Sequence, residues 1–146
     1  MSRVVAIFRD DFALRYVTSF MFSVILMYGF YVQVHGDFSP GGGFQGGVIV
    51  ASAIIMYAMV FGDVRIREVL PNLVTVGSIG LFIYIMTGMV SIFFGGNFLS
   101  YVFSLFDSVT EQKLGVFIVE LGVGITVCAS IASVYFDFAS LKNDIN

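Results

Sequence analysis

The chain has 146 residues, which is the length of one domain, and it carries a formal net charge of -3. Hydrophobic residues make up 58% of it and charged residues only 12%, about half the charged fraction of a typical globular chain. This composition excludes an ordinary soluble domain. The 7 lysines and arginines form no basic run, so we expect no nucleic-acid partner. One histidine and one cysteine supply neither a metal-ligand set nor a nucleophile–base pair, so we expect no metal, no cofactor and no enzymatic activity.

Residues 1–15 precede the first long apolar run. Val5, Phe8 and Phe12 fall on one helical face of this segment, and its charges lie mostly elsewhere. This pattern is typical of a short helix that lies in the interface of a membrane. We therefore predict an interfacial segment over residues 1–15.

Four apolar runs are long enough to cross the roughly 30 Å hydrocarbon layer as helices, which takes about 20 residues. They cover residues 16–34, 44–62, 73–94 and 114–136. The first and third runs have no charge and no polar face at helical spacing, which a helix of a soluble bundle would need. The sequence therefore predicts an all-α, polytopic integral membrane protein, with residues 1–146 forming a single membrane domain of four transmembrane helices.

Positive charge is distributed unequally between the two ends of these helices. With four spans, both termini and the connection between the second and third spans share one side of the membrane. That side holds six of the lysines and arginines: Arg3, Arg9, Arg15, Arg65, Arg67 and Lys142. The other side holds only Lys113, so the positive-inside rule predicts that both termini are cytoplasmic.

A glycine-rich segment, HGDFSPGGGFQGG at 35–47, joins the first two spans and faces outward in this topology. A phosphate-binding P-loop would follow a strand and end in Gly-Lys-Ser/Thr, so we exclude a nucleotide site here. Gly43, Gly47 and Ala51 recur every four residues, and such small-residue stripes let helix backbones approach closely in membranes. The sequence thus predicts a loop and helix-packing motif made of Pro40, Gly41, Gly42, Gly43, Gly46, Gly47, Ala51 and Gly124.

Polar groups in the same segment favour a second, compatible role as an ion or water vestibule. Irregular backbone at membrane depth is tolerated only where protein or a wet cavity surrounds it. His35, Asp37 and Gln45 are the candidate ion-pathway residues of this mouth, with Ser39 beside them. We expect the segment to end one helix and start the next where both meet other subunits.

Glu120 is the one charged residue inside a predicted span. Gly124, Cys128 and Ala132 follow it at four-residue intervals, so its carboxyl group shares a face with a close-packing stripe rather than with lipid. Intramembrane carboxyl groups often mark ion pathways, which makes Glu120 a candidate for such a pathway. The alternative is a structural carboxyl group that holds two helices together. One carboxyl group is not a proton relay, so we expect that the chain does not transport ions alone.

Two stretches of the sequence resemble a known family. HGDFSPGGGFQGGVIVASAI, which starts at His35, and ELGVGITVCAS, which starts at Glu120, are similar to the MnhB family, a small-subunit family of the Mrp-type (Mnh-type) multisubunit Na+/H+ antiporters. The resemblance covers most of the chain from Tyr16 to Phe136 and is most specific in the glycine motif.

This resemblance implies a small four-helix subunit, without a cofactor, of a hetero-oligomeric complex in the prokaryotic cytoplasmic membrane. Two large antiporter-like subunits of that complex would be among its partners, and the complex would exchange external protons for internal Na+. Related modules also occur in membrane-bound hydrogenase-type and other respiratory complexes, so the host complex stays open at this point.

Three functional hypotheses follow. The chain is a transporter subunit that contributes Glu120 to an ion path, or a purely structural assembly subunit, or a small channel that forms by homo-oligomerisation. The first two depend on other subunits, whereas the third requires only copies of this chain in a lipid bilayer.

Overall fold

A computed structural model describes residues 12–36, 41–62, 72–101 and 108–144. The described residues form four α-helices: α2 (Phe12–Val34), α3 (Gly43–Phe61), α5 (Leu73–Phe93) and α6 (Ser108–Asp144). All four are long and apolar enough to cross a membrane. The predicted all-α membrane fold is therefore confirmed. Most of the interfacial segment predicted over 1–15 lies outside the described residues, as do Asp37, Ser39 and Pro40.

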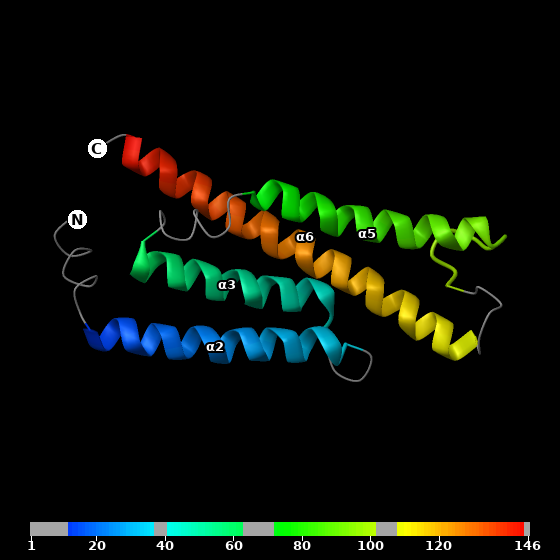
Figure 1. Cartoon of the computed structure of the whole chain (residues 1–146), viewed down its shortest axis with the longest axis horizontal. Coiled ribbons are helices and arrows are strands. Elements are labelled where there is room, and N and C mark those ends of the chain that lie inside the picture. The colour runs from blue at the N-terminus through cyan, green and yellow to red at the C-terminus, as the bar shows by residue number, and fades with distance from the viewer. Residues whose placement is uncertain (1–11, 37–40, 63–71, 102–107, 145–146) are drawn as a thin grey trace.

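The four helices lie side by side in the order α2, α3, α6, α5, with α6 crossing obliquely between α3 and α5 (Figure 1). Helices α2 and α5 run in one direction and α3 and α6 in the other, so the start of α2 and the end of α6 lie at the same end of the molecule (Figure 1). This arrangement is compatible with the predicted placement of both termini on one side. The side itself, the cytoplasm, stays a prediction.

Helix α6 is much longer than the span predicted over 114–136. Its 37 residues correspond to a length of about 55 Å at 1.5 Å per residue, which exceeds the roughly 30 Å hydrocarbon layer. The polar residues on both sides of the apolar run, such as Glu111, Gln112 and Lys113 before it, are good helix formers. The helix therefore continues beyond the apolar run at both ends.

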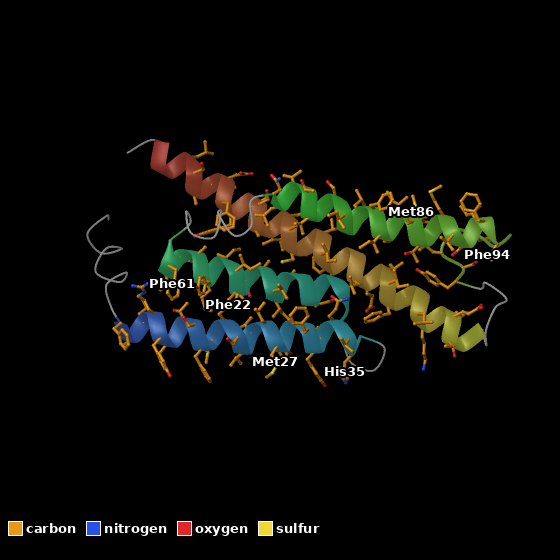
Figure 2. All side chains as sticks on the ribbon, viewed as in Figure 1. Phe22, Met27, His35, Phe61, Met86 and Phe94 are labelled. Carbon is orange, nitrogen blue, oxygen red and sulfur yellow. The ribbon has the colours of Figure 1, made fainter. Side chains whose placement is uncertain are left out.

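The helix contacts are lined mainly by small residues, and many large side chains are exposed. Among the described residues, Ser91 is the largest side chain with less than 2% of its surface exposed. Met27 and His35 point away from the array along the free edge of α2, whereas Phe22 lies between α2 and α3 (Figure 2). The buried residues of the helix contacts include Gly29, Gly43, Gly47, Ala51, Ala53, Ala58, Gly80, Gly88, Ala129 and Ala132. Close approach of backbones thus joins the helices, as is common in membranes. A small apolar cluster of Ala58, Ala132 and Phe136 adds to the contact between α3 and α6.

Candidate functional site

The candidate site lies at the end of the molecule where α2 ends and α3 begins. Backbone hydrogen bonding of α2 continues to His35, whose N–H donates to the carbonyl of Tyr31 over 3.0 Å. After the undescribed residues 37–40, Gly41 has a φ of 145°, which favours glycine. Gly42 then precedes the first residue of α3, and the Gln45 side chain accepts a hydrogen bond from the Gly42 N–H over 3.1 Å. Glycine therefore allows the sharp turn into α3, and Gln45 caps the new helix.

The carboxyl group of Glu120 on α6 lies against this turn. A Cβ atom built on Gly36 would lie 2.7 Å and 3.2 Å from the two carboxyl oxygens, and one built on Gly42 would lie 2.9 Å from Oε1. The carboxyl group thus occupies the space that side chains at positions 36 and 42 would need. Because Gly42 caps α3, the group also lies at a helix N-terminus, where negative charge is favourable.

The backbones of α3 and α6 come closest just beyond this point. A Cβ atom on Gly43 would fall on the backbone carbonyl group of Glu120. One turn later, a Cβ atom on Gly47 would lie 2.5 Å from the carbonyl oxygen of Gly124. The small-residue stripe of α3 therefore meets α6 of the same chain, and the contact fixes Glu120 relative to the glycine loop.

Gln33 is a site residue that sequence reasoning missed. Its Oε1 atom would lie 2.6 Å from a Cβ atom built on Gly124 and 3.0 Å from one built on Gly46, so the side chain reaches from α2 to both α3 and α6. Its Nε2 atom is buried and has no hydrogen-bond partner among the described residues. A weak signal was present, because Gln33 is the one amide in α2, and polar side chains in membrane helices often face other helices.

Two of the predicted ion-pathway residues make described contacts within or beside their own helices. The ring of His35 stacks on Tyr31, with centroids 4.3 Å apart. Gln45 is exposed and caps α3. Glu120 and Gln33 both lie against glycines of this region, Glu120 against Gly42 and Gln33 against Gly46, while Asp37 lies outside the described residues.

The opposite face of α6 makes an equally close contact with α5. A Cβ atom on Gly122 would lie 2.8 Å from the carbonyl oxygen of Gly80. The Thr126 hydroxyl donates to the carbonyl of Gly77 on α5 over 3.3 Å, and also to that of Gly122 over 2.8 Å. The sequence ELGVG thus places one glycine toward α5 and, two residues later, another toward α3, because residues two apart lie on opposite sides of a helix.

Another carboxyl-bearing residue on α6, Glu111, is buried, and sequence reasoning missed this as well. Glu111 lies outside the predicted span and is only 3% exposed. It lies one turn before Gly115, where the ring of Tyr101 occupies the place of a side chain. Within the described residues no group of three His, Cys, Asp or Glu side chains could hold a metal ion.

Comparison with known proteins places these features in a wider context. A family model described as a domain related to the MnhB subunit of Na+/H+ antiporter matches residues 13–133. The matched region contains both the glycine loop and Glu120.

Individual relatives match over nearly their whole length. A Na(+)/H(+) antiporter subunit of Bacillus subtilis (strain 168) is 32% identical over 133 residues, which cover 84% of this chain and 93% of that protein. A protein of Staphylococcus haemolyticus described as antiporter subunit mnhB2 is 34% identical over 137 residues, covering 84% and 95%. A Staphylococcus aureus (strain Newman) protein with the same description is 32% identical over 134 residues, again covering 84% and 95%.

Proposed function

The chain belongs to the family of domains related to the MnhB subunit of Na+/H+ antiporter, and from this premise we propose that it works as a small subunit of a multisubunit Na+/H+ antiporter in the cell membrane. The observation that carries the proposal is the extent of the similarity, which covers 84% of this chain and 93% of the Bacillus subtilis protein. The similarity therefore extends over nearly a whole subunit. Four helices that are apolar enough to cross a membrane fit a multi-pass protein.

Partners are proposed to be the other subunits of the complex, with lipid around them, and Na+ and H+ are the ions that the whole complex exchanges. The helix array supports this proposal because it leaves large apolar side chains exposed on several helices. Phe20 on α2, Met59 on α3 and Phe82 on α5 are examples. Contiguous exposed apolar surface of this kind is covered by lipid or by protein.

Glu120 is proposed to contribute to an ion path at the outer mouth of the complex. Its position at the N-terminus of α3 and beside the glycine loop supports the proposal, since irregular backbone at membrane depth is tolerated where it lines a wet cavity. A relay would need further titratable groups, which neighbouring subunits would supply. The purely structural role is the second candidate, and it is favoured by the close fit of the carboxyl group against Gly36 and Gly42.

Two substitutions at this position separate the candidates. Glu120→Gln keeps the shape of the side chain and removes its charge, whereas Glu120→Ala also empties the space beside the glycines. An ion-path role predicts that both variants assemble and that both lose Na+-dependent antiport in everted membrane vesicles. A structural role predicts that Glu120→Gln stays active and that Glu120→Ala fails to assemble. Asp137→Asn, which alters an exposed carboxyl group near the far end of α6, is the matched control and should behave as wild type.

The host complex is tested by co-purification. The C-terminally tagged chain is extracted in mild detergent, and the proteins that accompany it are identified. Recovery of other antiporter subunits supports the proposal. Recovery of hydrogenase or other redox subunits would instead assign the chain to a respiratory complex. If the chain were recovered alone and conducted ions in liposomes, the homo-oligomeric channel would replace the antiporter proposal.

A further inference from the structure

The far end of the α2–α3 pair, opposite the glycine loop, carries a groove that the proposed function does not use. It has a volume of about 320 Å³ and lies between the first turns of α2 and the last residue of α3. Its lining residues combine one cation, two hydroxyl-bearing side chains and two phenylalanine rings: Arg15, Tyr16, Ser19, Phe12 and Phe61. The groove is therefore polar and positively charged on one part of its surface and apolar on another.

Aromatic rings hold the guanidinium group of Arg15 in place. Its Cζ atom lies 5.0 Å from the centroid of the Phe61 ring, a cation–π contact between α2 and α3. The Phe61 ring stacks on Tyr57 with centroids 4.2 Å apart, and Tyr57 packs on Phe22 with centroids 5.0 Å apart. Phe22 and Phe61 both lie in the space between the two helices (Figure 2).

The contact with Phe61 does not use the hydrogen-bond donors of Arg15. A guanidinium group on the face of a ring is held by its charge, and its five N–H donors remain for other partners. Within the part of the chain that the structure describes, no carboxyl group forms an ion pair with Arg15. Ser19 lies four residues along α2, so its hydroxyl group is on the same face as Arg15.

We propose that this groove binds the phosphate group of an anionic phospholipid, with Arg15 as the main contact and the acyl chains along Phe12 and Phe61. The planar fork of guanidinium donors is well suited to bind phosphate. The groove lies at an end of membrane-spanning helices, which is the depth of lipid headgroups. The charge distribution predicts that this end faces the cytoplasmic leaflet, which is rich in anionic lipids. The proposal is independent of the antiporter function.

A phospholipid fits this groove better than free phosphate does. Free phosphate would use the cation and the hydroxyl groups but would make no apolar contact with the two phenylalanine rings. A phospholipid covers them with its acyl chains, and burial of apolar surface adds to the binding. The ligand is therefore expected to require both an anionic headgroup and a hydrocarbon chain.

The test measures lipid retention by the purified complex in mild detergent, using native mass spectrometry. Dioctanoyl phosphatidylglycerol, dioctanoyl phosphatidylcholine and inorganic phosphate are added in separate experiments. Wild type should retain phosphatidylglycerol in preference to phosphatidylcholine. Arg15→Gln should weaken that retention by about tenfold, the loss expected for one charge-assisted hydrogen bond. Lys113→Gln, which removes a cation at the other end of the molecule, should not change it.

Three results would overturn the proposal. These are an equal retention of phosphatidylglycerol by Arg15→Gln and wild type, an equal loss in Lys113→Gln, and displacement of the lipid by inorganic phosphate at similar concentration.

If Arg15→Gln does not assemble, Phe61→Leu serves as the second variant, because it keeps the charge and removes the ring that holds it. Retention should then fall several-fold, and unchanged retention in Phe61→Leu would count against the site.

Discussion

Gly47→Ala is expected to force α3 and α6 apart. The new Cβ atom would lie 2.5 Å from the carbonyl oxygen of Gly124 and 3.1 Å from its Cα atom. Both are backbone atoms of α6, so no side-chain rotation can relieve the contact. The helices would have to separate by roughly 1 Å to restore an ordinary contact distance of about 3.5 Å.

This overlap sets the loss in free energy of unfolding that Gly47→Ala causes. Forcing an extra methyl group into a close-packed contact lowers the free energy of unfolding by about 1–3 kcal/mol. The better helix propensity of alanine offsets this by about 1 kcal/mol. The net loss is therefore up to about 2 kcal/mol, and the shift of α6 would also displace the backbone of Glu120, which packs on Gly43 one turn away.

A matched control is available in α5. Gly77 also lies in a helix and also faces α6, but a Cβ atom built there would lie 3.4 Å from the Cβ atom of Ala129, an ordinary contact. Gly77→Ala should therefore keep only the gain in helix propensity and be neutral or slightly stabilising.

The assay heats the purified complex in mild detergent and measures, by size-exclusion chromatography, the temperature at which half of it survives. Gly47→Ala should lower this temperature by several degrees, and Gly77→Ala should leave it unchanged or raise it. Equal shifts for the two variants would refute the reasoning, because the two sites differ mainly in the distance from the new methyl group to the facing helix.

Two further predictions concern α6 and the segment before it. Thr126→Val removes the hydroxyl group that joins α6 to Gly77 while keeping the shape of the side chain. We therefore expect the free energy of unfolding to fall by about 0.6 kcal/mol and by no more than about 1.7 kcal/mol. A larger fall in the same heating assay would show that packing changed instead. Burial raises the pKa of the Tyr101 hydroxyl above its ordinary value of 10.0, with Tyr84 as the smaller cause. A difference titration of wild type against Tyr101→Phe, followed by phenolate absorbance, should place this group above pH 10, and a step at or below pH 10 would contradict the burial. Because the folded state favours the neutral hydroxyl, the stability linked to Tyr101 is present below pH 10 and is lost as the pH rises through its folded pKa.

The positions of the first three helices could be predicted from the sequence because hydrophobicity over a window of about 20 residues is a local property. The runs predicted over 16–34, 44–62 and 73–94 correspond to α2 (Phe12–Val34), α3 (Gly43–Phe61) and α5 (Leu73–Phe93). Hydrophobicity shows where a helix can lie in lipid, but it does not show where the helix ends. For that reason the length of α6 beyond residues 114–136 was not predicted.

The candidate site was only partly predictable. Glu120 and the glycine motif attract attention because a charge in a span and a dense run of glycines are both unusual. Gln33 gives a weaker signal, since a single amide near the end of an apolar run is common, and its importance depends on facing Gly46 and Gly124 from a different helix. The contacts of His35 and Gln45 were likewise not predictable from the sequence: one stacks on Tyr31 and the other caps α3.

The amino-acid order is enough to specify four apolar helices, the opposite directions of successive helices, and the motifs by which the family is recognised. The helix that each glycine meets is set instead by the packing of the whole array: Gly43 and Gly47 face α6, Gly80 faces α6 from the other side, and Gly29 faces α3. A stripe of small residues specifies a face for close approach, but many such stripes are nearly equivalent as partners. The choice among them depends on how all four helices fit together at once, which no local pattern contains.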